Sequence, residues 1–231
     1  MMKASLTLLA SAVALIAPLH AQNAEQILER ARLGAVLQNA DLHGKIRNGR
    51  EKTSVSLFLR NEDIQFTTGA GEERFHMRLG NNQFDLFEIV GGKTKAFPKK
   101  KFGQAIAGSD LTYEDLSLRF LYWPNPKLEG EERVDVHNCW KIRIDNPGKS
   151  GRYSAVFVWI HQKFGAFMKI EGFDGQGNKL KQFTVEEVMK LPDKTHTVKK
   201  IQVASYANGR RSGISYLEFD KPKKGPKGLG G

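Results

Sequence analysis

The chain is poor in cysteine, and its acidic residues are outnumbered. Its 231 residues contain a single cysteine, Cys139, so no internal disulfide can form. Lysine and arginine total 36 against 25 aspartate and glutamate residues, which gives a formal charge of +11. After the first residues, no run of about 18 uncharged apolar residues occurs, so we expect no membrane-spanning helix in the mature protein. The fold must depend on its own core, and the charge favours anionic partners.

The first 21 residues have the three-part pattern of a secretory signal peptide. Met1-Met2-Lys3 is a short positive region, residues 6–17 are apolar, and a segment ending at Ala21 completes the pattern. No cysteine follows the cleavage region, which argues against a lipoprotein anchor. We therefore predict export to the periplasm and a mature domain over residues 22–220, and export makes nucleic acid a poor choice of partner.

The last residues, 221–231, contain lysine, proline and glycine and almost no apolar side chains. Such a composition predicts disorder. A solubilising tail and a contact with an anionic membrane surface are both open interpretations of this basic segment.

Polar and apolar residues alternate with a period of two from residue 41 onward, which predicts half-buried strands. The clearest stretches are 54–60, 63–66, 74–79, 140–145 and 164–170. Turn signals rich in glycine and asparagine separate them, so neighbouring strands should pair antiparallel as a meander. Two further stretches, 83–90 and 153–161, carry apolar side chains on both faces and need cover on the second face.

Two helices are expected beside these strands. Asn23 can cap a helix over roughly 24–38. Ser109-Asp110 can cap a second helix that runs to about Tyr122, and Thr112 with Asp115 makes a second capping box. The predicted order is helix, five or six strands, helix, and five or six more strands, which is about ten or eleven strands in all.

A long sheet with one apolar face must cover that face, and two short helices cannot cover it alone. The remaining hollow would suit an acyl chain, because burial of each methylene stabilises by about 0.8 kcal/mol. Alternatively, facing side chains fill the interior completely. The residues expected to line the hollow are Val55, Leu57, Leu59, Phe75, Met77, Leu79, Trp140, Ile142, Met168 and Ile170.

Five stretches of the sequence resemble a known family in their order and spacing. They are Phe102-Gly103-Gln104 through Leu116, Leu128-Glu129-Gly130-Glu131-Glu132, Cys139-Trp140-Lys141-Ile142, 153–160 and 173–180. The chain is similar over most of residues 24–219 to the bacterial outer-membrane lipoprotein-sorting-like (LolA/LolB-like) family, in an uncharacterised branch of it. None of the matching stretches carries catalytic residues.

The resemblance implies a mainly β (α+β) fold, a strongly curved antiparallel half-barrel sheet with helices over its concave face. It also implies a non-enzymatic carrier or sensor that binds lipid or the acyl chains of lipoproteins, with transient contact to the inner or outer membrane surface and a monomer favoured. The family's hallmark basic residue near the second strand has no secure counterpart, although Arg47, Arg50 or Arg60 could be proposed. Contacts to an anionic headgroup are expected from Arg47, Lys99, Lys100 and Lys101. The alternative is an envelope module with a filled core and a protein partner.

Catalytic and metal-binding patterns are weak in this sequence. Its histidines are widely spread, and His137 with Cys139 lacks an evident partner pair, so we expect no metal and no cofactor. The stretch 174–178 resembles part of a calcium loop without its acidic ladder, which favours a hairpin turn. No Gly-x-Ser-x-Gly elbow or P-loop is present, so a hydrolase of envelope material would rest on secretion alone.

Overall fold

The structure is a computed structural model that describes residues 23–221, except 37–38, 61–62, 70–72, 81–82, 149–150 and 192–193. The predicted signal peptide and residues 222–231 of the predicted tail lie outside the described residues. Within the described part of the chain, no helix has the length and apolar character needed to cross a membrane.

Thirteen strands form one antiparallel sheet in the order β6-β5-β4-β3-β2-β1-β13-β12-β11-β10-β9-β8-β7. The first six are β1 (Asn39–Asn48), β2 (Glu51–Arg60), β3 (Asp63–Thr68), β4 (Glu73–Gly80), β5 (Gln83–Val90) and β6 (Lys93–Ala96). The others are β7 (Lys127–Val134), β8 (His137–Asp145), β9 (Ala155–His161), β10 (Phe167–Phe173), β11 (Lys179–Lys190), β12 (His196–Ala207) and β13 (Arg210–Phe219).

The predicted count of ten or eleven strands is therefore wrong, because the second run has seven strands. β6 and β7 show why a count based on alternating polar and apolar residues gives too few strands. They are the two edge strands, and nearly all of their side chains are exposed. A strand that buries little carries no apolar alternation, and charged side chains on an edge discourage pairing with another chain.

Two meanders meet at a single junction in this sheet. β1–β6 form the N-terminal half-sheet and β7–β13 the C-terminal half-sheet, and they join where β1 pairs with β13. At this junction Gly44 lies opposite Phe219. A Cβ at Gly44 would overlap the Glu218 carbonyl oxygen and lie 2.8 Å from the Phe219 Cα, so the junction requires glycine there.

The helices differ in part from the sequence prediction. α1 spans Ala24–Val36, while the expected single helix from 109 to 122 is wrong. The structure has the short helix α2 (Tyr113–Ser117) and then a 3-10 turn, η2 (Arg119–Tyr122), because Leu118 takes a left-handed conformation with φ 49°. The Thr112–Asp115 capping box is confirmed, with Asp115 N donating to Thr112 Oγ1 at 3.2 Å and Thr112 N donating to Asp115 Oδ2 at 2.8 Å.

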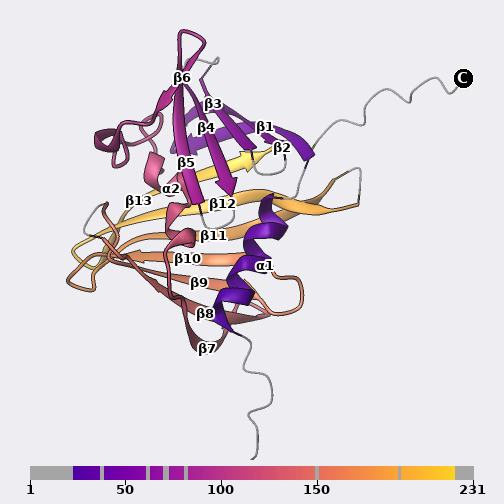
Figure 1. The fold of residues 1–231 in the computed structure, drawn as a ribbon, viewed down its shortest axis with the longest axis vertical. Helices are drawn as coiled ribbons and strands as arrows, with labels where there is room; N and C mark the ends of the chain where they lie inside the picture. The colour runs from indigo at the N-terminus through magenta and orange to yellow at the C-terminus, as the bar shows by residue number, and fades with distance from the viewer. Residues whose placement is uncertain are drawn as a thin grey trace, which may run out of the picture.

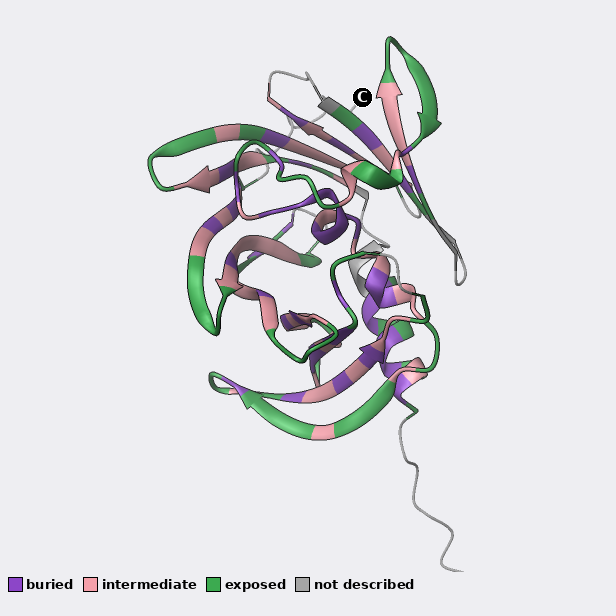
Figure 2. Ribbon diagram, turned by 90° about the vertical axis from the view of Figure 1, so that its left-hand side faces the viewer, coloured by how far each residue is buried: buried purple, intermediate pink, exposed green. Residues whose placement is uncertain are grey.

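Residues 97–126, which we call the crossing segment, connect the two opposite edges of the sheet. The segment contains η1 (Lys99–Lys101), α2 and η2, and it has to pass over the sheet to reach β7. Figure 1 shows α2 between the two half-sheets, with α1 across β8–β10. Ile106 and Phe120 of the segment are completely buried, and Figure 2 shows the purple of buried residues concentrated on α1 and this interior.

The face of the sheet that packs against the crossing segment and α1 carries two core clusters, and we call it the inner face. The N-terminal cluster is built on β1–β5 and includes Ile106 and Tyr113 of the crossing segment. The C-terminal cluster joins β8–β10 to α1 and to Phe120 and Leu121. The cover that the sequence required for 153–161 is present, because Val156, Val158 and Ile160 face this cluster.

A third, smaller cluster lies on the opposite, outer face. Val134, Cys139 and Trp159 form it, with Phe157 and Met168 packed against them. The Lys169 Nζ lies 3.6 Å from the centre of the Trp159 ring. Strand β9 is therefore covered on both faces, by α1 and the crossing segment inside and, outside, by Val134, Cys139 and Met168 packed around Trp159 under the Lys169 ammonium.

Candidate functional site

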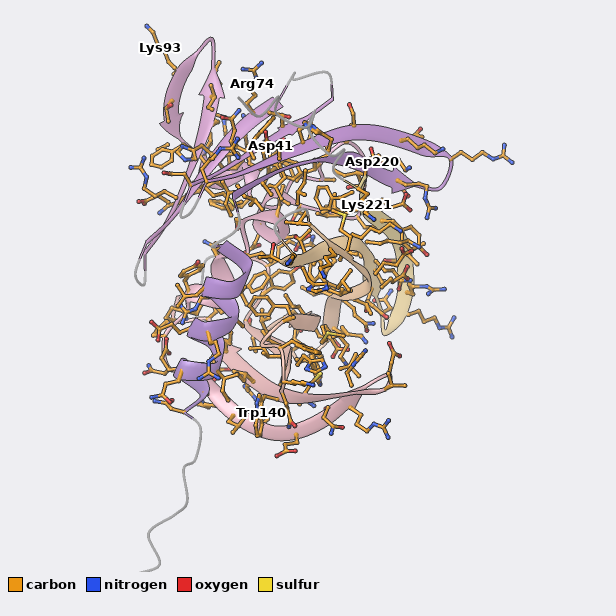
Figure 3. All side chains as sticks on the ribbon, turned by 90° about the vertical axis from the view of Figure 1, so that its right-hand side faces the viewer. Asp41, Arg74, Lys93, Trp140, Asp220 and Lys221 are labelled. Carbon is orange, nitrogen blue, oxygen red and sulfur yellow. The ribbon has the colours of Figure 1, made fainter. Side chains whose placement is uncertain are left out.

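The residues predicted to line a hollow are divided between the two half-sheets. Figure 3 shows this separation, with Trp140 far from Arg74, the neighbour of Phe75. Of the predicted lining residues, Val55, Leu59, Phe75 and Met77 are buried in the N-terminal cluster, and Leu57 is partly buried beside them. In the C-terminal cluster Ile142 and Ile170 are buried and Trp140 is partly buried. Most of these side chains thus contact other side chains rather than an open space.

Two of the predicted lining residues lie elsewhere. Met168 packs against the outer cluster, because the pairing of β10 with β9 shifts register between Phe167 and Lys169. This shift moves one residue to the other face, a result that a strict period of two cannot predict. The side chain of Leu79 lies outside the described residues.

The four predicted headgroup contacts are also separated. Arg47 lies on the outer face, where its Nη2 is 3.1 Å from Glu218 Oε1 and its guanidinium is 4.2 Å from the Tyr216 ring centre. Lys101 pairs with Glu88 at 2.6 Å. Lys99 and Lys100 are exposed, and of the four only Lys99 lines a hollow described below.

Apolar side chains remain partly accessible on the inner side of the molecule. They belong to strands near the junction and to the crossing segment, and they are Leu57, Leu116, Tyr122, Phe183 and Ile201. The crossing segment and α1 therefore leave part of the apolar inner face incompletely covered. Apolar surface of this kind is a feature of binding sites.

A hollow of about 380 Å³ lies where the crossing segment meets β5 and the loop before β9, and we call it the crossing-segment hollow. Its volume falls within the range of small-molecule sites, roughly 300–1,000 Å³. Its lining combines aromatic, basic and acidic side chains: Asp85, Leu86, Phe97, Lys99, Phe102, Gly103, Glu114, Arg119, Gly151 and Arg152. Because Leu86 and Phe97 belong to the N-terminal cluster, this hollow borders the core.

Another hollow, of about 370 Å³, is lined by Phe58, Arg60, Asp63, Gln65 and His76. These residues alternate with the buried ones of β2–β4, so this hollow lies on the outer face. Asp63 Oδ1 lies 2.8 Å from His76 Nε2 and 3.1 Å from Arg78 Nε. Asp63 and His76 are thus paired with each other, Arg60 is paired with Asp41, and no part of the N-terminal cluster lines this site.

A buried polar network fixes the crossing segment between the two core clusters. Lys181 of β11 lies 3.7 Å from Asp115 Oδ2, and its ammonium donates to Ser205 Oγ at 2.8 Å and to the Asp110 carbonyl oxygen. The Tyr153 hydroxyl donates to Asp115 Oδ1. This network was not predicted from the sequence, although Lys181 at an inward position of an alternating strand was a signal for a buried polar contact.

Burial dominates the electrostatics of this network. It raises the pKa of the Asp115 carboxyl and lowers the pKa of the Lys181 ammonium. It also raises the pKa of the Tyr153 hydroxyl well above its usual value. Since each group is costly to bury alone, the three are stable there only as long as they stay in contact.

We expect Thr112→Ala to destabilise the protein by about 1–2 kcal/mol, because it removes one half of the capping box that orients Asp115. Thr112→Ser keeps the hydroxyl oxygen and should cost less than half as much. Urea unfolding of both variants measures the difference. Equal stability of the two variants would contradict a capping role for this side chain.

Among the described residues, no group of three or more His, Cys, Asp or Glu is arranged to hold a metal ion. The carboxylate of Asp174 accepts hydrogen bonds from the backbone of Gln176 (2.9 Å) and Asn178 (2.8 Å), which confirms that this stretch is a hairpin turn. The rings of His137 and His161 lie 5.0 Å apart, beside the buried Cys139.

One protein-family model matches residues 90–227, which is more than half of the chain. The family is described as an uncharacterized protein. The chain belongs to this family. The matched region begins at the end of β5 and so covers the crossing segment and the whole C-terminal half-sheet. Among curated proteins, no sequence matches the chain.

Three solved structures share the fold of this chain. A domain named for outer membrane lipoprotein sorting from Vibrio parahaemolyticus is 16% identical, with a TM-score of 0.64 over 86% of this chain and 92% of that one. A LolA superfamily protein from Nitrosomonas europaea is 17% identical, with a TM-score of 0.62 over 89% and 96%. A DUF1329 family protein from Desulfovibrio piger is 16% identical, with a TM-score of 0.64 over 85% and 91%. The resemblance stated from the sequence is thus confirmed for the fold.

Proposed function

We propose that this protein is a non-enzymatic carrier or sensor that binds the acyl chains of a lipid or lipoprotein on the inner face of its sheet. The supporting observation is the set of partly buried apolar side chains between the two core clusters, beside a hollow that reaches the N-terminal cluster. The LolA-like fold adds to this support. An acyl chain bound there would remove its own methylenes and these side chains from water, and burial of each methylene would stabilise the complex by about 0.8 kcal/mol.

Uptake requires the crossing segment to shift, because its side chains Ile106 and Phe120 occupy the interior. The segment is held to the sheet by the apolar packing of Ile106 and Phe120, by the polar network of Lys181 and Asp115, and by Asn48, whose Nδ2 donates to the Gly108 carbonyl at 2.8 Å. The strands of the sheet are hydrogen-bonded to one another independently of this segment, so a shift of the segment need not unfold the sheet. We propose that a bound chain lies between the segment and the strands.

The cellular setting is part of the same proposal. Residues 1–21 act as a cleaved signal peptide, residues 22–220 form the carrier domain in the periplasm, and the basic residues from 221 onward contact the membrane surface or keep the protein soluble. A monomer that exchanges acylated cargo with either membrane fits this arrangement.

A second candidate is a module of the cell envelope with a filled core and a protein partner. It is favoured by the dense interior, in which Val55, Phe66 and Ile142 have an exposed fraction of 2% or less. The two candidates differ in one observable: the carrier takes up an acyl probe and the interaction module does not.

The test uses the mature protein, residues 22–231, purified under gentle conditions. We expect mass spectrometry to detect co-purified lipid, and we expect a fluorescent fatty acid to bind with saturable affinity. If no lipid is found and the probe shows no saturable uptake, the interaction module is favoured and the carrier is rejected.

The position of the chain is tested by Leu57→Trp, which fills space on the inner face of β2. We expect this variant to weaken probe binding about tenfold, equivalent to about 1.4 kcal/mol. Val136→Trp in the turn between β7 and β8 is the matched control, because Val136 is 74% exposed. Equal loss of binding in both variants would contradict binding on the inner face.

A further inference from the structure

We propose that the crossing-segment hollow binds the anionic group at the end of the acyl chain, and that Lys99 and Arg152 are the two cations that contact it. This inference rests on the acyl-binding function proposed above and names the headgroup chemistry. The shared chemistry is a carboxylate or a phosphate attached to an apolar chain.

The apolar part of the ligand has a continuous wall in this hollow. Phe97 and Leu86 are buried members of the N-terminal cluster, and Phe102 packs against the same cluster. The rings of Phe97 and Phe102 lie 5.4 Å apart. The first methylenes after the headgroup would therefore contact aromatic side chains, and the rest of the chain would continue toward the inner face.

The buried acid of the hollow is already neutralised. The Glu114 carboxylate is 1% exposed, and its Oε1 accepts hydrogen bonds from Arg119 Nε at 3.2 Å and Nη2 at 2.8 Å. Its Oε2 accepts from the Arg152 backbone N–H at 3.0 Å. A Cβ at Gly151 would overlap this pair, so the absence of a side chain there lets the loop approach closely. Glu114 thus positions both the Arg119 guanidinium and the backbone of Arg152.

Two cations of the hollow remain for a ligand. Within the described residues, the side chains of Lys99 and Arg152 form no ion pair, whereas the neighbouring Lys101 is paired with Glu88. A Cβ placed on Gly103 would lie 3.8 Å from the Arg152 Cδ. The Arg152 side chain therefore extends over Gly103, which has no side chain to contact it.

The charges on the wall of the hollow favour an anion. Its lining holds three basic residues, Lys99, Arg119 and Arg152, against the acids Asp85 and Glu114. With Arg119 and Glu114 paired, one anionic group between Lys99 and Arg152 would gain two charge-assisted contacts beside an apolar wall. An uncharged headgroup would gain neither contact, so the hollow should discriminate by charge.

The test compares lauric acid, lauryl phosphate and lauryl alcohol, which share one chain, by calorimetric titration of the mature protein. We expect the two anions to bind about tenfold or more tighter than the alcohol, since a hydrogen bond to a charged group contributes about 1.5–3 kcal/mol. Arg152→Gln and Lys99→Gln should each weaken anion binding about tenfold and leave the affinity for the alcohol unchanged. Lys100→Gln and Arg210→Gln, at exposed positions outside the hollow, are the matched controls and should bind like the unaltered protein.

Each outcome separates the two proposals. Tighter binding of the acid or of the phosphate supports the headgroup site and identifies a fatty acid or a phospholipid as its source. Equal affinity for acid and alcohol, unaffected by Arg152→Gln and Lys99→Gln, would overturn the headgroup site and leave the acyl carrier standing. If none of the three ligands binds, both proposals fail.

Discussion

Replacing Gly44 with alanine is expected to destabilise the protein by about 3 kcal/mol or more and to lower its melting temperature by roughly 10 °C. The added Cβ would overlap the Glu218 carbonyl oxygen, which is backbone and cannot rotate away. Relief requires β1 to move away from β13, and this pairing is the only place where the two half-sheets share strand hydrogen bonds within the described sheet. The cost should therefore fall on the junction as well as on global stability.

Thermal unfolding measures the total effect, and native-state hydrogen exchange locates it. We expect the amides of β1 and β13 near Gly44 to exchange faster, while those of β8–β10 keep most of their protection. Gly103→Ala is the matched control, because its Cβ would meet only the Arg152 Cδ, at an ordinary 3.8 Å. A Gly44→Ala protein as stable as the Gly103→Ala protein would show that the junction is looser than the structure implies.

Lys181→Met is expected to destabilise the protein by about 3–5 kcal/mol, the usual cost of removing one partner from a buried ion pair. The side chains of Lys181 and Asp115 are 3% and 0% exposed, so the remaining carboxylate would have neither its cation nor water. The Asp110 carbonyl and the Ser205 hydroxyl would also lose a donor. The crossing segment would then be held less firmly over the inner face.

A double-mutant cycle tests this interpretation. Asp115→Asn removes the charge, so the double variant should be clearly more stable than the sum of the two single effects predicts. Lys179→Met on the same strand is the control, because Lys179 is 29% exposed and its pair with Glu171 is 3.5 Å long. The control should cost less than about 1 kcal/mol. Additive effects of Lys181→Met and Asp115→Asn would argue against a coupled buried pair.

The sheet strands that bury one face were predictable from the sequence. In β2, Val55 and Leu59 are buried at the positions that the alternation assigned to the interior, and β3 alternates with Ile64 and Phe66 buried. The α2 start was equally predictable, because the Thr112–Asp115 capping box depends on residues three apart. These features follow from the period of a strand and from local hydrogen bonds.

The edge strands, the break between α2 and η2, and the grouping of residues in the crossing-segment hollow could not be predicted from local sequence patterns. β6 and β7 bury almost nothing and so carry no alternating pattern. The left-handed Leu118 divides a segment whose apolar spacing fits one helix. Arg152 and Lys99 meet in one hollow although they are far apart in the sequence, and no motif links them.

The sequence by itself determined a mainly β chain of antiparallel hairpins with one apolar face, because side-chain period and turn residues act over a few neighbouring positions. Only the tertiary structure decided how that face is covered. Lys181 meets Asp115 through the packing of the crossing segment on the sheet, and Gly44 meets Phe219 through the pairing of β1 with β13. Contacts between residues distant in the chain depend on the packing of all the elements at once, and no local pattern encodes that packing.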